Sequence, residues 1–306
     1  MTQYAPVGIC TYTRINHLRQ TIEALLNNDL AGETAVFVFS DAPRPGDENK
    51  VAEVRDYLGT IRGFGEFHVI ARQQNGRVPN CRGGVVHLLG EYGRMIFMED
   101  DIVTAPGFLK FMNQALDKYE NNDRVFSVCG YCPPIPINAG YGYDAYFWRR
   151  FSAWGYGIWK NRYDCIHNVS PGQYNRLVSS WKLRRSFIKG AGADALPILK
   201  REAYGEINAN DMKAMYAQFL SDQYTIYPTG SLVRNTGMDG TGVHCGVTDK
   251  YEVTLNEKTT FLLPENLVFE EDLIKQCQKF YEIDYTQIVL SNIRSLINQK
   301  LLNRKT

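Results

Sequence analysis

The chain has 306 residues, of which 44% are hydrophobic, and its 34 Lys and Arg residues nearly balance its 33 Asp and Glu residues. This composition predicts a soluble globular protein with one extended core or two domains, and it excludes a disordered chain. The formal net charge of +1 excludes a bulk attraction for nucleic acid, and no local basic patch is apparent in the first 280 residues.

The beginning of the chain predicts a first strand-helix unit. The run Val7 to Tyr12 is typical of a buried strand, and apolar residues from Leu18 to Leu26 then recur at helical spacing, with Asn16 as the expected cap of that helix. A second unit follows, with a strand over Ala35 to Ser40 and a helix face through residues 51–58. This alternation predicts βαβ units and a mainly parallel sheet.

The same pattern continues to about residue 130. A third strand is expected over Phe67 to Ala71 and a helix around residues 85–89, and a fourth strand over Arg94 to Met98 ends in the acidic triplet 99–101. Pro106 is suited to open the next helix, because its missing N–H costs nothing in a first turn. Residues 1–130 are therefore predicted to form one half of an α/β domain, closed by a strand at residues 125–128.

Beyond residue 130 the pattern is looser. Residues 141–160 are rich in Trp, Tyr and Gly, which is typical either of core packing or of a pocket wall for a sugar ring or nucleobase. A helix over Ala209 to Leu220, a strand at residues 225–227 and a glycine-rich loop over Gly230 to Gly246 are expected next. Residues 131–250 are predicted to be the second half of the same domain, and 251–306 a largely helical tail.

Several features concern the cell compartment. No apolar run is much longer than Ala35 to Phe39, far short of the roughly 20 residues that span a bilayer, and the first residues do not resemble a secretory signal. Seven scattered cysteines, with one CxxC pair at Cys129 and Cys132 to which we assign no function, favour a reducing compartment. A cytoplasmic location is expected, with peripheral contact at the inner face of a membrane as a variant.

Polar side chains follow each of the predicted parallel strands, where ligands bind in open α/β sheets. They are Thr11 to Arg14, Ser40-Asp41, the loop 75–82 and Glu99-Asp100-Asp101. Carboxylates at a strand end can hold a hard divalent cation whose other ligands are diphosphate oxygens and water. If the strand continues through the triplet, Glu99 and Asp101 share one face and Asp100 takes the other. A solvated turn is the simpler alternative.

The chain resembles the GT-A fold nucleotide-sugar glycosyltransferases, most closely the bacterial family 2 type and the N-acetylglucosaminyltransferase I type. The resemblance runs from Pro6 to Gly246 and rests on sequence elements that come in the expected order. These elements are Ile9–Arg14, Phe39–Asp41, Met95–Val103, Phe147–Trp159 and Ser231–Cys245. It implies an α/β GT-A fold with a Rossmann-like, mainly parallel central sheet flanked by helices, and a helical C-terminal extension.

The resemblance also implies roles at the donor. Thr11, Arg14 and Asp41 would bind the nucleotide, and the acidic triplet would be the metal motif of DXD type. Asp101 would then ligate the metal directly, while Glu99 and Asp100 would face the donor sugar and ribose. The ion would be manganese or magnesium, acting as a Lewis acid on the departing diphosphate.

A carboxylate base is also needed if the transfer inverts the sugar, because the acceptor hydroxyl must lose its proton. Related sequences place that base at Asp211, although the residue before it, commonly Trp in the family, is Asn210 here. Asp194 and Asp239 are alternatives, and Asp211 could instead only stabilise the start of a helix.

Three further side chains are candidates for the site. His244, in the glycine-rich loop, could touch metal or phosphate, although a lone His is more often structural. Trp148 and Trp154 could line the sugar or acceptor pocket, with core packing as the alternative. The Arg149-Arg150 pair and Arg14 are expected to offset the acidic triplet.

The predicted function is metal-dependent transfer of a hexosyl or N-acetylhexosaminyl group from a nucleotide-diphosphate sugar, UDP-sugar in the first instance. The acceptor would be a saccharide or lipid-linked saccharide in surface glycan synthesis (lipopolysaccharide, capsule or exopolysaccharide), and no nucleic acid is expected. The alternatives are a nucleotide-sugar or carbohydrate-binding module without transferase activity and a sugar-phosphate nucleotidyltransferase. A nucleotidyltransferase or a dehydrogenase should show a glycine-rich loop at the first strand, whereas Gly8 to Arg14 contains a single glycine. A glycosidase would need two carboxyl groups flanking the glycosidic bond and no nucleotide site.

The last 22 residues, Tyr285 to Thr306, place apolar residues at helical spacing and contain four basic residues and no acid. Such a segment is typical of an interfacial membrane anchor, but packing on the protein body or on a second subunit is the more common role.

Overall fold

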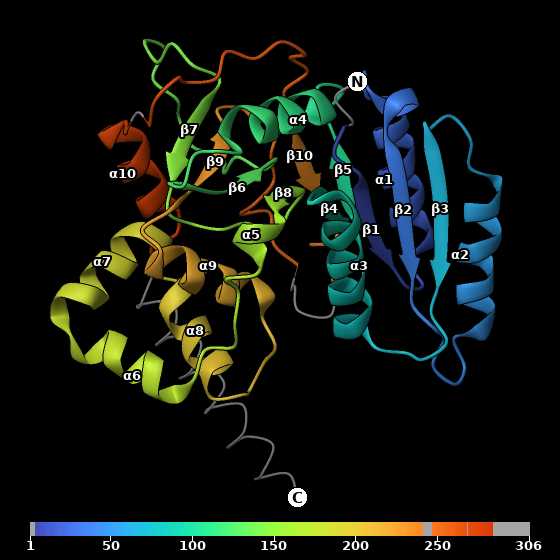
Figure 1. The fold of residues 1–306 in the computed structure, drawn as a ribbon, viewed down its shortest axis with the longest axis horizontal. Coiled ribbons are helices and arrows are strands. Elements are labelled where there is room, and N and C mark those ends of the chain that lie inside the picture. The colour runs from blue at the N-terminus through green and yellow to red at the C-terminus, as the bar shows by residue number, and fades with distance from the viewer. Residues whose placement is uncertain (1–3, 241–246, 268, 284–306) are drawn as a thin grey trace, which may run out of the picture.

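The computed structural model describes residues 4–240, 247–267 and 269–283. Its centre is an eight-stranded sheet in the order β3-β2-β1-β4-β8-β6-β9-β7 (Figure 1). The strands are β1 (Val7–Thr11), β2 (Ala35–Ser40), β3 (Glu66–Ala71), β4 (Arg94–Glu99), β6 (Val125–Cys129), β7 (Ala145–Trp148), β8 (Tyr156–Trp159) and β9 (Tyr224–Pro228). Only β7 and β8 run against the others, which confirms the mainly parallel sheet.

Helices cover both faces of this sheet. One face packs against α1 (Ile15–Leu26), α2 (Glu48–Thr60), α4 (Phe108–Tyr119) and α10 (Glu271–Phe280). The other packs against α3 (Arg77–Tyr92), α6 (Pro171–Ser179), α7 (Trp181–Ala191), α8 (Ala195–Ala203) and α9 (Asn210–Leu220). Short elements are the 3-10 turn Ala31–Glu33 and the helix α5 (Lys160–Tyr163). In Figure 1, α6 to α9 form the lower left part of the molecule.

The parallel half follows from alternation along buried strands. On β1, Val7 and Ile9 pack into the core beneath α1 and α2, whereas Cys10 packs on the opposite face beneath α3. A strand buried on both faces needs apolar residues at every position, which is why these strands are near-continuous apolar runs. Two expectations about helix starts are wrong. The helix after β1 begins at Ile15 with no side-chain cap, so Asn16 lies inside it, and α4 begins at Phe108, after Pro106.

The aromatic region after residue 130 is part of the core. It supplies β7 and β8, whose eight residues are all buried, and antiparallel pairing inserts β8 between β4 and β6. A second, two-stranded sheet pairs β5 (Ile102–Thr104) with β10 (Val233–Asn235) directly after the acidic triplet. The mixed α/β sheet with helices on both faces is the expected GT-A architecture.

The C-terminal part packs on the body. The segment after residue 250 crosses α4, where the Tyr119 hydroxyl donates to the Pro264 carbonyl at 2.6 Å and Gln114 Nε2 donates to the Phe261 carbonyl at 3.0 Å. Helix α10 then buries Leu273 and Cys277 in the same core. Within the described part of the chain, no helix combines the length and apolar character of a membrane crossing.

Gly107 marks the close contact between this segment and the start of α4. A Cβ at Gly107 would lie 2.2 Å from the Lys258 carbonyl oxygen. We expect Gly107→Ala to lower the free energy of unfolding by about 1–3 kcal/mol, the usual effect of overpacking. Gly59→Ala in α2 is the control, because its Cβ would meet nothing within 4 Å and should raise stability by up to about 1 kcal/mol. Urea unfolding measures the stability of both variants. Equal stabilities of Gly107→Ala and Gly59→Ala would contradict this close contact.

Candidate active site

The carboxyl ends of β1, β2 and β4 meet at one edge of the sheet and bring the predicted polar residues together. Thr11, the last residue of β1, joins two groups of side chains. Its carbonyl accepts a hydrogen bond from the Asp41 N–H at 3.1 Å, and its Oγ1 donates to Asp100 Oδ2 at 3.0 Å. The side chains expected at this edge therefore form one connected site.

The acidic cluster, defined as Glu99, Asp100 and Asp101, surrounds Arg14. The Arg14 Nη2 contacts Asp100 Oδ1 and lies 2.8 Å from Asp101 Oδ2. Asp100 and Asp101 thus face the same guanidinium, and the expectation that they take opposite faces is wrong. The reason is that β4 ends at Glu99 and the chain turns there, so the alternation of an extended strand stops.

The loop after β10 fixes the position of Asp101. The Thr236 N–H donates to the Asp101 carbonyl at 2.8 Å, and the Thr236 hydroxyl donates to it at 3.1 Å. A Cβ at Gly237 would lie 2.1 Å from Asp101 Oδ2, so only glycine leaves room for this carboxylate. Sequence analysis did not single out Thr236 or Gly237, because the pairing of β5 with β10 joins segments about 130 residues apart.

Burial and mutual repulsion perturb the acidic cluster. Burial, together with the charges of Asp101 and Asp100, raises the pKa of Glu99 to about 7. Burial also raises the pKa of Asp100, although Arg14 opposes that shift. Both shifts indicate that the negative charges of the cluster oppose one another, so a bound cation would stabilise the charged carboxylates, to which Arg14 and Arg77 already supply part of the positive charge. Arg149 and Arg150 do not supply positive charge to the cluster, because Arg149 pairs with Asp222 and Arg150 pairs with Asp194.

Asp101 has the features of a metal ligand. Its Oδ1 is buried without a hydrogen-bond partner within the described residues, while its Oδ2 is held by Arg14. In the same part of the chain, no three His, Cys, Asp or Glu side chains converge as a complete metal cage. One free carboxylate oxygen in an electronegative cluster fits a Mg²⁺ or Mn²⁺ ion that takes its remaining ligands from phosphate oxygens and water.

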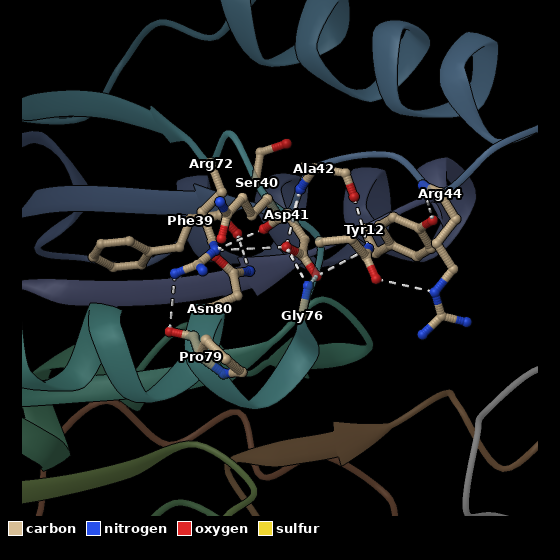
Figure 2. Close-up of polar contacts among 12 residues, drawn as sticks. Tyr12, Phe39, Ser40, Asp41, Ala42, Arg44, Arg72, Gly76, Pro79 and Asn80 are labelled. Atoms are coloured by element: carbon tan, nitrogen blue, oxygen red, sulfur yellow. Dashed lines mark hydrogen bonds and ion pairs between the residues drawn. The ribbon is translucent and has the colours of Figure 1, made fainter.

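Asp41 lies buried at the end of β2, where it clasps the loop after β3 (Figure 2). Its Oδ1 accepts from the N–H groups of Ala42 and Gly76 at 2.9 and 3.1 Å. Its Oδ2 accepts from the Gly76 N–H at 2.9 Å and from Asn75 Nδ2 at 3.3 Å. Both carboxylate oxygens therefore already have internal partners, and Asp41 shapes the loop that borders the site.

We expect Asp41→Ala to lower the free energy of unfolding by about 3 kcal/mol, because it leaves the N–H groups of Ala42 and Gly76 without their side-chain acceptor. The Asn75 amide keeps its hydrogen bond to the Ala42 carbonyl at 2.7 Å. Asp41→Asn should lose less, since one acceptor oxygen remains. Urea unfolding of both variants measures this difference. Unchanged stability of Asp41→Ala would contradict the clasp and leave nucleotide contact as the role of this residue.

Asp211 belongs to a separate group of charges at the start of α9. It is half-buried, and burial raises its pKa, opposed by the Met212 N–H and the positive charge of Arg150. Arg150 itself binds Asp194 with both terminal nitrogens, at 2.8 and 2.9 Å. Asp239, the other alternative base, lies 3.2 Å from His17 Nε2. Both alternatives are thus paired with a basic side chain.

A buried ion pair that sequence analysis missed sets the entry into α9. Glu202 Oε2 accepts from the Ala209 N–H at 2.7 Å, and its Oε1 lies 3.2 Å from Lys213 Nζ. Lys213 also donates to Asn208 Oδ1 at 2.8 Å. The sequence signals this ion pair only through one acidic and one basic residue, Glu202 and Lys213, on helix faces that are otherwise apolar. That pattern is too common to single out.

The three remaining candidates are placed differently. Trp148 is 1% exposed and packs between Tyr227, Tyr281 and Arg150, so it lies in the core. Trp154 is half-buried against Tyr131. His244 lies outside the described residues.

Residues 7–137 match the family model described as Glycosyl transferase family 2. This range holds β1 to β6, and with them Arg14, Asp41 and the acidic cluster. The match covers 131 of the 306 residues, and together with the mixed α/β sheet it supports a glycosyltransferase of the family 2 type with the GT-A fold. A comparison with curated protein sequences found no match.

Solved structures show more distant likeness. Staphylococcus aureus TarS residues 1–349 has 11% identity and a TM-score of 0.42, covering 77% of this chain and 61% of that one. S. aureus TarS has the same identity and TM-score, covering 83% and 41%. The mannosyltransferase PcManGT from Pyrobaculum calidifontis, in complex with GDP-Man and Mn²⁺, has 14% identity and a TM-score of 0.38, covering 71% and 74%. The chain thus spans less than two thirds of TarS, and the likeness to the family 2 type rests on the sequence match of residues 7–137.

Proposed function

We propose that this glycosyltransferase moves a sugar from a nucleotide-diphosphate sugar, UDP-sugar in the first instance, to a saccharide or lipid-linked saccharide with inversion. The observation that carries the proposal is the buried Oδ1 of Asp101, which has no hydrogen-bond partner among the described residues and lies in the acidic cluster at the ends of parallel strands. A surface-glycan pathway, namely lipopolysaccharide, capsule or exopolysaccharide synthesis, is the context that the resemblance implies.

In this proposal the donor lies against the edge formed by Thr11, Arg14 and the acidic cluster. Asp101 would hold a manganese or magnesium ion, which when bound supplies positive charge to the departing diphosphate. Glu99 and Asp100 would face the donor sugar and ribose. Arg14 keeps Asp100 and Asp101 together, Thr236 holds the Asp101 backbone in place, and Gly237 leaves room for the Asp101 carboxylate.

Asp211 would accept the proton of the acceptor hydroxyl. The acceptor oxygen forms a bond to the anomeric carbon from one side, while the bond to the diphosphate oxygen breaks on the other and the electron pair leaves with the diphosphate. A raised carboxylate pKa suits a base, because proton transfer is most efficient when the pKa lies near the working pH.

The halves 1–130 and 131–250 would then supply donor and acceptor sites, with residues 251–306 as an extension. Trp154 remains a candidate for the acceptor pocket. Residues 285–306, for which membrane contact or packing on a second subunit was predicted, lie outside the described residues.

A thermal-shift panel of nucleotides and nucleotide sugars, with and without manganese, tests the proposal. We expect one nucleotide sugar to stabilise the protein only with metal, by about 2.7 kcal/mol at a hundredfold excess over its dissociation constant. A nucleotidyltransferase would instead respond to a nucleoside triphosphate. If no nucleotide sugar stabilises the protein with metal, the proposal is wrong.

A further inference from the structure

One region outside the site is strongly and uniformly basic. Residues 165–193, which include α6 and α7, contain five Lys and Arg residues and no Asp or Glu. The chain averages 33 acidic residues in 306, so a stretch of this length would hold about three. The basic residues are Arg176, Lys182, Arg184, Arg185 and Lys189, and all five are exposed. None of them forms an ion pair with another described residue.

Helix α7 arranges part of this charge in a row. Trp181, Arg185 and Lys189 follow each other at four-residue spacing on one side of the helix, with Lys182 beside them. We call Trp181, Lys182, Arg185 and Lys189 the α7 face; the row spans about 12 Å at 1.5 Å per residue. The opposite side of α7 packs on the body through Phe187, Gly190 and Ala191, so the α7 face points away from the core.

A large apolar side chain accompanies the charge. Trp181 is 71% exposed. The Arg185 guanidinium carbon lies 5.2 Å from the centre of the Trp181 ring. The other three Trp residues are buried or half-buried. An exposed Trp beside Lys and Arg is the composition that sits at the boundary between lipid headgroups and acyl chains.

We propose that the α7 face docks on an anionic phospholipid bilayer. Its charge attracts the anionic headgroups, and Trp181 enters the boundary below them. A second copy of the chain would bring an identical basic face and be repelled. Residues 285–306 contain no acid either, so that segment offers no countercharge. This inference does not depend on the proposed function.

The structure corrects the expectation that the first 280 residues contain no basic patch. The five basic residues are spread over 14 positions and are interrupted by apolar and polar residues. They gather only because α6 and α7 fold as a hairpin and because four-residue spacing aligns part of α7. No acidic residue lies between these five basic residues, and this lack of acids was the signal that the sequence contained.

Vesicle flotation with the full chain tests the proposal. We expect the protein to float with vesicles of phosphatidylcholine and phosphatidylglycerol, and not with phosphatidylcholine alone. The variant Lys182→Gln/Arg185→Gln/Lys189→Gln should partition about a hundredfold more weakly, since each basic residue near such a surface contributes roughly fivefold. The matched control Lys50→Gln/Arg62→Gln/Lys110→Gln removes the same charge from exposed positions elsewhere and should bind like the wild type.

Trp fluorescence tests the same contact without a charge variant. Anionic vesicles should shift the emission of the wild type to the blue and reduce its quenching by acrylamide, and Trp181→Phe should remove both changes. Unchanged Trp181 emission on bound vesicles would overturn the proposal. The proposal would also be wrong if flotation were lost in the tail variant Arg294→Gln/Lys300→Gln/Arg304→Gln/Lys305→Gln while the variant Lys182→Gln/Arg185→Gln/Lys189→Gln bound the vesicles fully. If the protein bound a single-stranded DNA oligonucleotide as tightly as anionic vesicles, and the vesicles left Trp181 emission unchanged, the α7 face would be assigned to nucleic acid instead.

Discussion

Asp211→Asn should reduce sugar transfer by about 10²–10⁴-fold and leave donor binding unchanged. The substitution keeps the size of the side chain and an oxygen that can accept the Met212 N–H, but it removes the ability to take a proton from the acceptor hydroxyl. The factor is the usual contribution of a positioned general base. Release of nucleoside diphosphate from the donor, measured at saturating donor, gives the loss in kcat.

The two alternative carboxylates provide the matched controls for this prediction. Asp194→Asn weakens the two-nitrogen contact with Arg150, and Asp239→Asn weakens the contact with His17. Both should leave the transfer rate within about tenfold of the wild type, since neither removes the base. If Asp194→Asn or Asp239→Asn abolishes transfer while Asp211→Asn does not, the assignment of the base is wrong.

The same substitution has a consequence for stability, and its sign follows from the pKa. Burial raises the pKa of Asp211 in the folded protein above its ordinary value of 3.8, so the charged form opposes folding. The benefit of the protonated form is fully present below 3.8 and is lost as the pH rises through the raised pKa. Asp211→Asn should therefore be more stable than the wild type at neutral pH and equal to it near pH 3. Urea unfolding at both pH values measures this.

Asp101→Asn should abolish metal-dependent donor binding. The amide keeps an oxygen for Arg14 but removes the negative charge that would hold the ion. Loss of an outer partner of a metal ligand already costs about 10–100-fold in affinity, so loss of the ligand charge should cost at least a hundredfold. Titration of the donor with and without manganese measures the effect.

The control for Asp101→Asn is the stability of the metal-free protein. One fewer charge relieves repulsion within the acidic cluster, so the variant should unfold at the same or a higher temperature than the wild type. Loss of donor binding together with unfolding would reveal a structural defect instead. Full metal-dependent binding by Asp101→Asn would contradict its role as the ligand.

The parallel half of the fold was predictable because its signals are local. Strands β1, β2 and β4 are buried apolar runs bounded by turn residues, and the polar residues at their ends are adjacent to them in sequence. The turn after Glu99 was not predictable, because whether a strand continues depends on pairing beyond it. The second half depends on contacts between distant segments. Strands β7 and β8 lie in a region whose aromatic residues fit a pocket wall as well as a core.

The candidate site shows the same limit. The position of the acidic triplet after a strand indicated a cation site, and the family resemblance implied Asp101 as its ligand, but Thr236 and Gly237 reach Asp101 from about 135 positions away. Asp41 was expected at the nucleotide, and its clasp on Gly76 depends on how the loop after β3 folds back. The pairs of Arg150 with Asp194 and of Glu202 with Lys213 arise only when α8 and α9 pack beside the sheet.

The central claim is that separate carboxylates serve the metal and the acceptor. Donor binding and nucleoside diphosphate release, measured with manganese on the wild type, Asp101→Asn and Asp211→Asn, test it most directly. We expect the wild type to bind the donor and release nucleoside diphosphate, Asp101→Asn to do neither, and Asp211→Asn to bind the donor without release. Release by Asp211→Asn at the wild-type rate, or metal-dependent binding by Asp101→Asn, would contradict it.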